Sequence, residues 1–453
     1  MKKDHETART KHDIYSVVSI LILLGSLLVI TMISFLSEFG HHPDEYDVKE
    51  CLNWGITHWI WPDMRTVGIG LGDTYSWYGY TKVCNYTPYF LIAGKIAWPF
   101  KLFMDVLPWY RMPNLLLAIL LMFILIKRLK DKPYLMLGFG VCVQAWYIFS
   151  YVTADAQDFL LTFISIMLLC DKESLLWKTI DSEDEKRSKI VLQCILLGLL
   201  YGLILLGKYY YYANVMLAFI VLVSYMIKQT SPEVRKKLLL RYILIAGTCA
   251  AVWLGRCLID VHYYGFDRNS AKIEMAEKYA SPDKKPSTPV EEQDVTWKMA
   301  SKGYTIADFF KINDTWFART FRSFASCRIT VTGDNFYYVI IALLYIFVYT
   351  FIGIYLCREG NAFLFIFGTL LNISGVVASL GFSYISDCQP QGRYLLPIVL
   401  TTCYLGSLSR SLWNNKVFRY AVLLTGVMSV AYFGLKDSRE LIDLTYAKNL
   451  ILG

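Results

Sequence analysis

Long apolar runs constrain the fold of this chain more than any other feature. A membrane-spanning helix needs about 20 mostly apolar residues. Runs of about this size lie near residues 15–35, 113–129, 135–152, 157–171, 190–207, 211–228, 239–260, 335–356, 362–382, 395–409 and 418–435. Because 55% of the 453 residues are hydrophobic and the mean hydropathy is +0.40, a single water-soluble globule is excluded. The pattern predicts an all-α polytopic membrane protein with about eleven transmembrane helices.

The distribution of Lys and Arg predicts how these spans are oriented, because cytoplasmic loops are enriched in both residues. The first run follows a basic N-terminus and has no cleavage site after it, which favours an uncleaved signal anchor with its N-terminus inside. The segment 89–107 is apolar enough to span, yet Lys95, Lys101 and two prolines favour a helix lying at the membrane surface. With that segment at the surface, 22 of the 45 Lys and Arg residues fall in inside segments. Segments 37–112 and 261–334 and the C-terminal tail are then expected outside.

The formal net charge of +8 is explained by this topology and gives no reason to expect a nucleic-acid partner. The 11 cysteines are scattered, with neither a CxxC nor a Cys/His metal pattern. Cys51 and Cys84 both fall in the first outside segment, and the sequence leaves open whether they are bonded.

An acidic cluster follows the first span directly, in the stretch Phe39-Gly40-His41-His42-Pro43-Asp44-Glu45-Tyr46-Asp47. Two adjacent carboxylates beside a proline and two histidines suit a proton acceptor or a cation site. An equally good interpretation is a solvated loop in which the Asp after Pro caps a helix. Sequence chemistry alone does not separate the two.

A second acidic pair, Asp155 and Asp158, sits between two spans on the same expected side of the membrane. Its spacing of three places both carboxylates on one helical face, although Asp155 would also serve as a helix cap. Lys208 and Arg393 reach the same layer at span ends and have no local acidic partner. Arg256 lies four residues before Asp260, which favours a structural ion pair on one helix.

In this order the motifs resemble those of the GT-C superfamily of integral-membrane glycosyltransferases, which includes protein O-mannosyltransferases and lipid A aminoarabinose transferases. The similar elements, in order, are HHPDEY after the first span, the surface segment TPYFLIAGKIAWPFKLF, the span start RMPN, the span junction YVTADAQDFLLTF and the Lys-ended span GLILLGKYYYY. The later QGRYLLP looks like a motif of a related uncharacterised bacterial membrane-protein family. The resemblance covers roughly the first 230 residues and thins beyond residue 240.

The resemblance implies transfer of a monosaccharide, with inversion, from a polyprenyl-phosphate donor to a surface glycan, lipid or protein acceptor. Asp44 aligns with the family's catalytic Asp and is expected to act as general base. Glu45 would orient the acceptor or a metal, and Asp155 would complete the acidic site. Lys208 and Arg393 are the expected ligands of the donor phosphate.

Further residues are expected near the substrates. Lys82 and Arg256 are reserve phosphate ligands, and His42, Asp158, Tyr209 and Tyr394 are candidates for substrate contact, although an interfacial aromatic belt explains the Tyr run equally well. No cofactor is certain. A divalent cation, Mg²⁺ or Mn²⁺, is left open, with Asp44, Glu45 and Asp155 as its ligands if it is present.

The expected organisation is a GT-C-like module over 1–260 with surface helices in its outer segment 37–112, an extracytoplasmic segment 261–334, and C-terminal helices with a tail over 335–453. The protein is expected in the plasma membrane, in contact with its lipids and with its active site on the extracytoplasmic side. Two alternatives remain: a transporter of lipid-linked sugars or polysaccharides, which would bind phosphate through the same cations without a base, and a polysaccharide polymerase or ligase.

Overall fold

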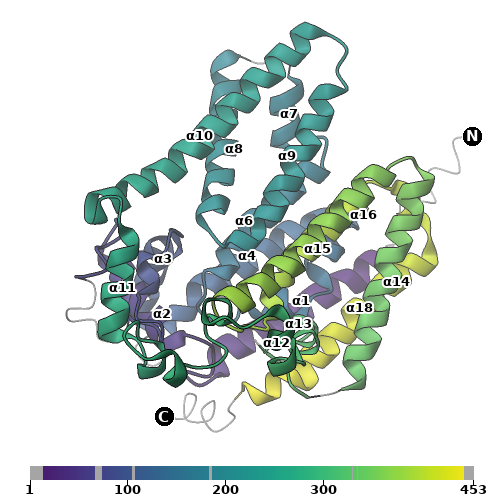
Figure 1. The fold of residues 1–453 in the computed structure, drawn as a ribbon. Coiled ribbons are helices and arrows are strands. Elements are labelled where there is room, and N and C mark those ends of the chain that lie inside the picture. Colours follow the sequence, from purple (N-terminus) through teal and green to yellow (C-terminus); the bar gives the residue numbers. More distant parts are fainter. Residues whose placement is uncertain are drawn as a thin grey trace, which may run out of the picture.

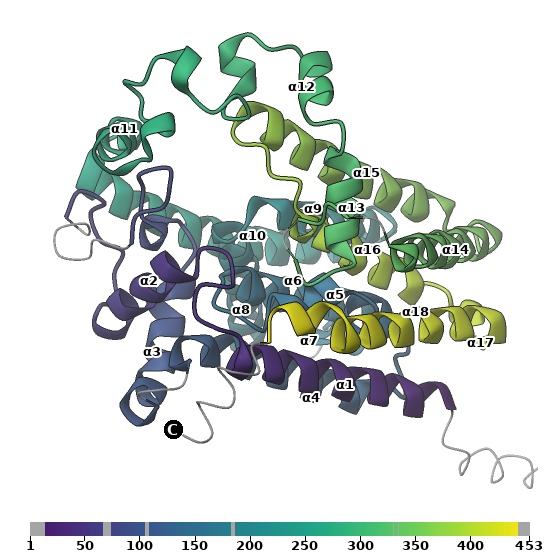
Figure 2. The ribbon, with the colours of Figure 1, turned by 90° about the horizontal axis from the view of Figure 1, so that it is seen from below.

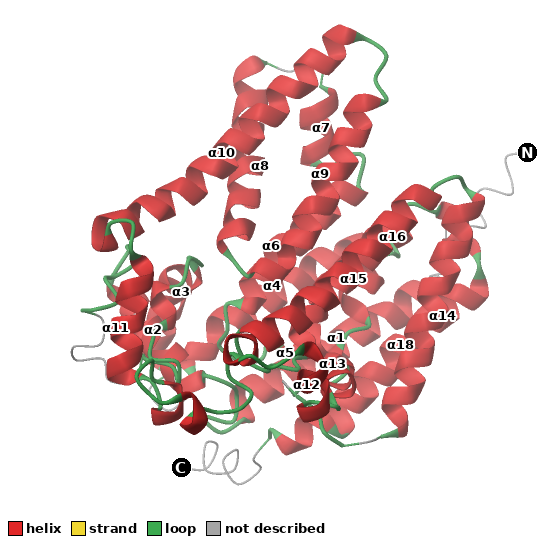
Figure 3. Cartoon of the chain, in the orientation of Figure 1, coloured by secondary structure: helices red, strands yellow, loops and turns green. Residues whose placement is uncertain are grey.

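The computed structural model describes residues 14–66, 74–104, 108–182, 186–328, 330–333 and 335–442, and the regular secondary structure of these residues is helical (Figure 3). Eight of the described helices are long and apolar enough to cross a membrane. They are α1 (Ile14–Leu36), η2 with α4 (Trp109–Arg128), α8 (Arg187–Leu206), η4 with α9 (Tyr209–Ile227), α10 (Pro232–Tyr264), α14 (Phe336–Arg358), α15 (Ala362–Ile385) and α18 (Lys416–Leu435) with η9 (Asp437–Glu440). The chain is therefore an all-α protein of the polytopic membrane class.

The other three predicted spans are shorter or broken, so the expected count of eleven is not confirmed. The run 135–152 forms η3 (Met136–Gly140), a π-helical turn, and then α5 (Val143–Tyr147). The run 157–171 lies in α6 (Asp155–Cys170), and the run 395–409 lies in α16 (Leu396–Ser407). At 1.5 Å per residue these two helices rise only about 24 and 18 Å, which is less than a hydrocarbon core of about 30 Å. Most residues of both helices are buried within the protein. An apolar run in a sequence is compatible with an interior helix as well as with a span.

One apolar core joins the beginning and the end of the chain. Leu23 of α1, Trp146 of α5 and Phe433 of α18 are fully buried in it. Helix α1 runs beside α18, where a Cβ added at Gly25 would lie 3.2 Å from Val430 (Figure 1). The first and last thirds of the chain are therefore packed as one helical body.

Short helices gather at one end of the bundle, in the lower part of Figure 1, which we call the site end. They are α2 (Glu45–Thr57), η1 (Lys82–Cys84), α3 (Tyr89–Phe103), α11 (Arg268–Tyr279), η5 (Pro282–Lys284), η6 (Val290–Glu292), η7 (Met299–Lys302), α12 (Ile306–Ile312) and α13 (Trp316–Phe324). The helices α7 (Leu175–Asp181) and α17 (Arg410–Asn414) lie at the other end (Figure 1).

Helix α3 lies where the sequence predicts a surface helix, although residues 105–107 of that segment lie outside the described residues. It packs against α2 through two glycines, since a Cβ on Gly55 would lie 2.0 Å from the Phe90 carbonyl oxygen and one on Gly94 would lie 2.5 Å from Gly55. Figure 2 shows α2, α3 and α11 grouped on one side of the bundle. This group carries the acidic stretch around Asp44. Its position on a membrane surface remains a prediction.

Candidate functional site

Asp44 has a strained backbone and a partly exposed carboxylate. It occupies the N-cap position of α2, yet its φ of 60° is left-handed and its carboxylate makes no capping hydrogen bond. Such a conformation costs a non-glycine residue of order 1–3 kcal/mol and persists only where the surroundings impose it. Asp44 therefore precedes the first residue of a helix, as the capping interpretation expects, but its side chain does not cap that helix. Its side chain keeps 43% of its surface exposed and forms an ion pair with Lys82, with Nζ 2.8 Å from Oδ2.

A fully buried ion pair holds this conformation in place. Arg111, at the start of α4, donates to both carboxylate oxygens of Glu45 at 2.6 and 2.9 Å. The guanidinium also donates to carbonyls at the end of α1, including that of Ser37 at 2.7 Å. The backbone N–H of Gly40 donates to the second oxygen of Glu45 at 2.9 Å. Arg111 therefore satisfies carbonyls that the helix end leaves without partners, and it fixes the residue next to Asp44.

Glu45 cannot take the role expected from the sequence. Its side chain has no exposed surface, and both of its oxygens are already engaged. A carboxylate in this position is not accessible to an acceptor or a metal ion. Glu45 is a positioning residue for Asp44.

Lys82 lies between two carboxylates. Its Nζ is 2.8 Å from Asp44 and 3.0 Å from Asp47, and its side chain is 18% exposed. Asp47, three residues after Asp44, is buried, and its pKa is raised by burial and by the charge of Asp44 in spite of Lys82. The pKa of Asp44, in contrast, is lowered. Two neighbouring carboxyl groups whose pKa values are shifted in opposite directions can separate proton-acceptor and proton-donor roles.

Asp155 forms the opposite wall of the site. Its side chain is 1% exposed, and Arg393 forms an ion pair with it at 3.1 Å. The Tyr210 hydroxyl donates to its other oxygen at 2.6 Å, and Lys208 Nζ lies 3.9 Å away. Burial alone would raise the pKa of Asp155, but Lys208 and Arg393 outweigh burial and lower it. The carboxylate is therefore charged and serves to hold the two cations, instead of capping the next helix.

Asp158 shapes the chain that carries Lys208. It is fully buried, and it accepts the backbone N–H of Lys208 at 3.0 Å. A Cβ on Gly207 would lie 2.6 Å from the Asp158 carboxylate, so a larger residue there would displace that carboxylate. Asp158 is thus not accessible for substrate contact, and the expectation that it binds substrate is wrong.

The cations of both walls act on Asp44. Burial alone would raise the pKa of Asp44, but Lys82, Arg393 and Lys208 together lower it below its ordinary value. Arg393 therefore lies close enough to influence Asp44 while it is paired with Asp155. The structure brings Asp44, Asp155, Lys82, Lys208 and Arg393 into one electrostatic cluster, as the sequence predicts for four of them and as a reserve for Lys82.

A network between distant segments closes this cluster on one side. Tyr78 donates a short hydrogen bond to Asp387, and the amide of Gln389 donates to the Tyr78 hydroxyl at 3.0 Å. Tyr394 donates a short hydrogen bond to the amide oxygen of Gln389. Trp297 stacks on Tyr78 with ring centroids 5.0 Å apart. Tyr78 therefore joins the segment 37–112 to the segment before Arg393, and Trp297 of the segment 261–334 packs on Tyr78.

Tyr209 and Tyr394 line a cavity of about 280 Å³ together with Tyr210 and residues of α9 and α15. The rings of Tyr210 and Tyr394 are 5.4 Å apart, and Tyr209 is 45% exposed. Because Tyr210 also donates to Asp155, this cavity adjoins the charged cluster. Tyr209 and Tyr394, the two tyrosines that the sequence suggests for substrate contact, therefore line a cavity next to the charged cluster.

His42 and Arg256 lie away from any accessible surface of this cluster. His42 is 2% exposed, its Nδ1 is 3.0 Å from the Tyr147 hydroxyl, and its ring stacks on Tyr151. Burial, with Arg111 and His41, lowers its pKa, so the ring is neutral. Arg256 is 3% exposed, pairs with Asp260 and donates to the Cys84 carbonyl at 2.9 Å. His42 as a substrate contact is wrong, and Arg256 is the structural partner of Asp260 instead of a phosphate ligand.

The metal-ligand set left open by the sequence is not formed. Asp44 faces Lys82, Glu45 faces Arg111 and Asp155 faces Arg393, so the three carboxylates do not converge. Among the described residues, no group of three His, Cys, Asp or Glu side chains could hold a metal ion. Cys51 and Cys84 are both buried free thiols, which resolves the disulfide question against a bond.

Sequence reasoning missed two partners of the site. Asp47 shares Lys82 with Asp44, and its spacing of three along a helix is the signal that would have found it. Tyr210, within the Tyr run, holds Asp155, and no local signal distinguishes it from its neighbours. Arg111 was part of a motif, but its pairing with Glu45 joins residues 66 positions apart.

Comparisons with protein-family models, with curated proteins and with solved structures gave no match to this chain. A functional assignment must therefore come from the geometry of the charged cluster and from the motifs that supply its residues.

Proposed function

We propose that the chain is a membrane glycosyltransferase of the GT-C type, with Asp44 as its general base on the extracytoplasmic side. The observation that carries the proposal is the partly exposed carboxylate of Asp44, held in a left-handed backbone conformation, paired with Lys82 and under the electrostatic influence of Arg393 and Lys208. An aspartate that only began a helix would need neither the strain nor the cations. The donor is a polyprenyl-phosphate monosaccharide, and the acceptor is a surface glycan, lipid or protein that presents a hydroxyl group.

In this mechanism Asp44 takes the proton of the acceptor hydroxyl as the hydroxyl oxygen forms its bond to the anomeric carbon. The bond between that carbon and the phosphate oxygen breaks on the opposite side, so the configuration inverts. Polyprenyl phosphate leaves with the electron pair. It needs little protonation, so a single base suffices.

The lowered pKa of Asp44 means that its carboxylate is ionised before the acceptor arrives. Lys82 lies 3.0 Å from Asp47 and stays paired there when Asp44 binds a proton. The shared lysine thus allows the charge of Asp44 to change without leaving a cation unpaired.

In this proposal Arg393 and Lys208 hold the donor phosphate. Asp155, which also accepts a hydrogen bond from the Tyr210 hydroxyl, orients Arg393, and Asp158 fixes the backbone of Lys208. Preorganised cations of this kind stabilise the charge that develops on a leaving phosphate. The adjoining cavity lined by Tyr209 and Tyr394 is the proposed entry for the first isoprenoid units.

A membrane assay with a panel of polyprenyl-phosphate monosaccharides tests the proposal. Membranes containing the wild-type chain are expected to transfer one sugar of the panel, and membranes with Asp44→Asn are expected to lose transfer by at least about 100-fold. Glu38→Gln, a carboxylate with a 54% exposed side chain in the same segment, is the matched control and should leave the rate unchanged.

Two other outcomes would assign a different function. Movement of the intact lipid-linked sugar across the membrane at the same rate in wild type and Asp44→Asn would indicate a transporter. Transfer of preassembled polymer, with no activity on monosaccharide donors, would indicate a polysaccharide polymerase or ligase.

A further inference from the structure

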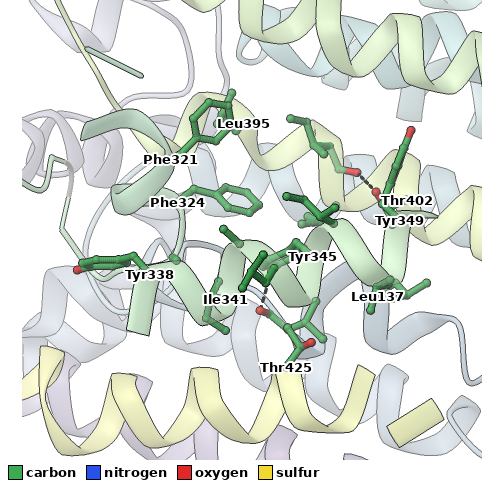
Figure 4. Close-up of a pocket in the computed structure, with 18 of the residues that line it drawn as sticks. Leu137, Phe321, Phe324, Tyr338, Ile341, Tyr345, Tyr349, Leu395, Thr402 and Thr425 are labelled. Carbon is green, nitrogen blue, oxygen red and sulfur yellow. Dashed lines mark hydrogen bonds between the residues drawn. The ribbon is translucent and has the colours of Figure 1, made fainter. Parts of the chain in front are cut away.

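A second, larger cavity lies between α13, α14, α16 and α18, away from the acidic residues (Figure 4). Its volume is about 770 Å³. Phe321 and Phe324 of α13 form one side, Ile341 and Tyr345 of α14 another, and Leu395 lies where α16 begins. We call this cavity the lateral chamber.

Four hydroxyl groups in the lining of the lateral chamber already have hydrogen-bond partners within the protein. Tyr345 donates to the Val141 carbonyl at 2.7 Å, and Tyr349 is bonded to the Thr369 hydroxyl at 2.9 Å. Thr402 and Thr425 donate to carbonyls one turn earlier in their own helices, at 2.7 and 2.8 Å. Because a cavity holds water or sugar only where polar partners remain, this lining favours a hydrocarbon occupant.

The depth of the lateral chamber matches one leaflet of a bilayer. Its lining begins with Tyr338, in the first turn of α14, and extends to Thr350. Twelve residues of helix rise about 18 Å, close to half of a hydrocarbon core of about 30 Å. Arg322, the one charged residue among the described residues of the lining, donates to the Thr332 carbonyl just before α14 and so lies at the same end as Tyr338.

The lateral chamber is separated from the charged cluster by η8 (Gly392–Leu395). Leu395 lines the chamber, whereas Tyr394 lines the smaller cavity beside Asp155. The turn is locked against α13, since Gly392 donates to the Ser323 hydroxyl at 2.6 Å and a Cβ on Gly392 would lie 2.1 Å from the Phe324 nitrogen. The η8 turn therefore separates an acyl chain in the chamber from the Arg393 side chain, which faces Asp155. A lipid donor whose phosphate binds Arg393 would not place its hydrocarbon chain in this chamber.

We propose that the lateral chamber binds one acyl chain of a bilayer phospholipid from the leaflet at the site end. The lipid fills the space between α13 and α14 and packs against the back of η8. It is a resident lipid and not a substrate. This inference does not depend on glycosyl transfer.

Photolabelling in vesicles tests it. The full chain is reconstituted into phosphatidylcholine and phosphatidylglycerol vesicles containing phosphatidylglycerol with a diazirine in its acyl chain, irradiated, and mapped by peptide mass spectrometry. We expect saturable labelling of chamber residues such as Phe324, Ile341 and Tyr345. Ala342→Trp places a ring in the chamber and is expected to lower this labelling about tenfold, because the ring occupies volume that the acyl chain would fill.

Ala250→Trp, the same change at an exposed position of α10, is the matched control and should leave chamber labelling unchanged. Ile346→Trp, at a chamber position that is 63% exposed, repeats the test if Ala342→Trp does not fold. Labelling spread evenly over the lipid-facing sides of α10 and α14 in the wild type would overturn the proposal. Displacement of the photolipid by equimolar polyprenyl phosphate would also overturn it, because the chamber would then belong to the donor.

Discussion

The adjacent residues Asp44 and Glu45 form ion pairs that differ in exposure: Asp44 with Lys82, and Glu45 with Arg111. Glu45 and Arg111 have no exposed surface, and every oxygen of the carboxylate has a donor. Asp44 keeps 43% of its side chain exposed and shares its lysine with Asp47. We call these the buried pair and the open pair.

Two adjacent residues of one short motif thus have different roles: Glu45 has a structural role, and Asp44 has the proposed chemical one. The buried pair ties α2 to the ends of α1 and α4, so the backbone of Asp44 has no freedom to relax out of its left-handed conformation. The open pair leaves a carboxylate that can exchange its partner. A residue in the buried pair should therefore affect folding, and a residue in the open pair should affect turnover.

The largest expected effect is on the buried pair. Glu45→Gln leaves Arg111 buried without its counter-charge, which typically costs about 3–5 kcal/mol of unfolding free energy. Denaturant unfolding in detergent micelles measures it. Glu38→Gln should change the unfolding free energy by less than about 0.5 kcal/mol, since its partner His41 is also exposed. Equal effects of the two substitutions would abolish the distinction between the pairs.

Arg393 belongs to an intermediate case, because its pair with Asp155 is buried but adjoins the open pair. Arg393→Met is expected to lower transfer about 100-fold to 1000-fold through loss of phosphate stabilisation. Arg393→Lys retains the charge without the guanidinium fork and should restore stability more than rate. Equal recovery of both would make Arg393 purely structural.

Lys82 gives a change in pH dependence. Asp44 is active as a base when deprotonated, so the rate falls as pH falls through its pKa, which Lys82 helps to lower. Lys82→Met raises that pKa and should move the acid limb of the kcat/KM profile to higher pH. Lys49→Met, a cation that stacks on Phe39, is the control. An acid limb that stays in place would show that another group controls the profile.

The smallest effect is expected at Lys208, whose side chain is 38% exposed and 3.9 Å from Asp155. Lys208→Met should raise the KM for the donor about tenfold, as expected for loss of one charge-assisted phosphate contact. Its unfolding free energy should change by less than about 1 kcal/mol. A loss as large as that of Glu45→Gln would place Lys208 in the buried class.

Much of this fold follows from local signals in the sequence. The long apolar runs predicted the helices α1, α8, α9, α10, α14, α15 and α18, and the Lys- and Pro-bearing segment after residue 88 predicted α3. The interior helices α6 and α16 were predicted as spans because an apolar run does not show whether protein or lipid surrounds it.

The site was predictable in its residue types and not in its partners. Asp44, Asp155, Lys208 and Arg393 stood out as charges at span ends, where their desolvation needs an explanation. The burial of Glu45 and His42 depends on Arg111 and Tyr147, which are 66 and 105 positions away. Adjacent acidic residues look alike in a sequence, and only packing decides which of them is accessible.

The most direct test of the account separates donor binding from turnover in Asp44→Asn. Asparagine keeps the shape of the side chain but cannot take a proton from an acceptor hydroxyl. We expect donor affinity within about threefold of wild type, transfer reduced by at least about 100-fold, and a cooperative unfolding transition like that of wild type. Transfer at the wild-type rate by a folded Asp44→Asn protein, or donor affinity that falls as much as the rate, would contradict the role of Asp44 as general base.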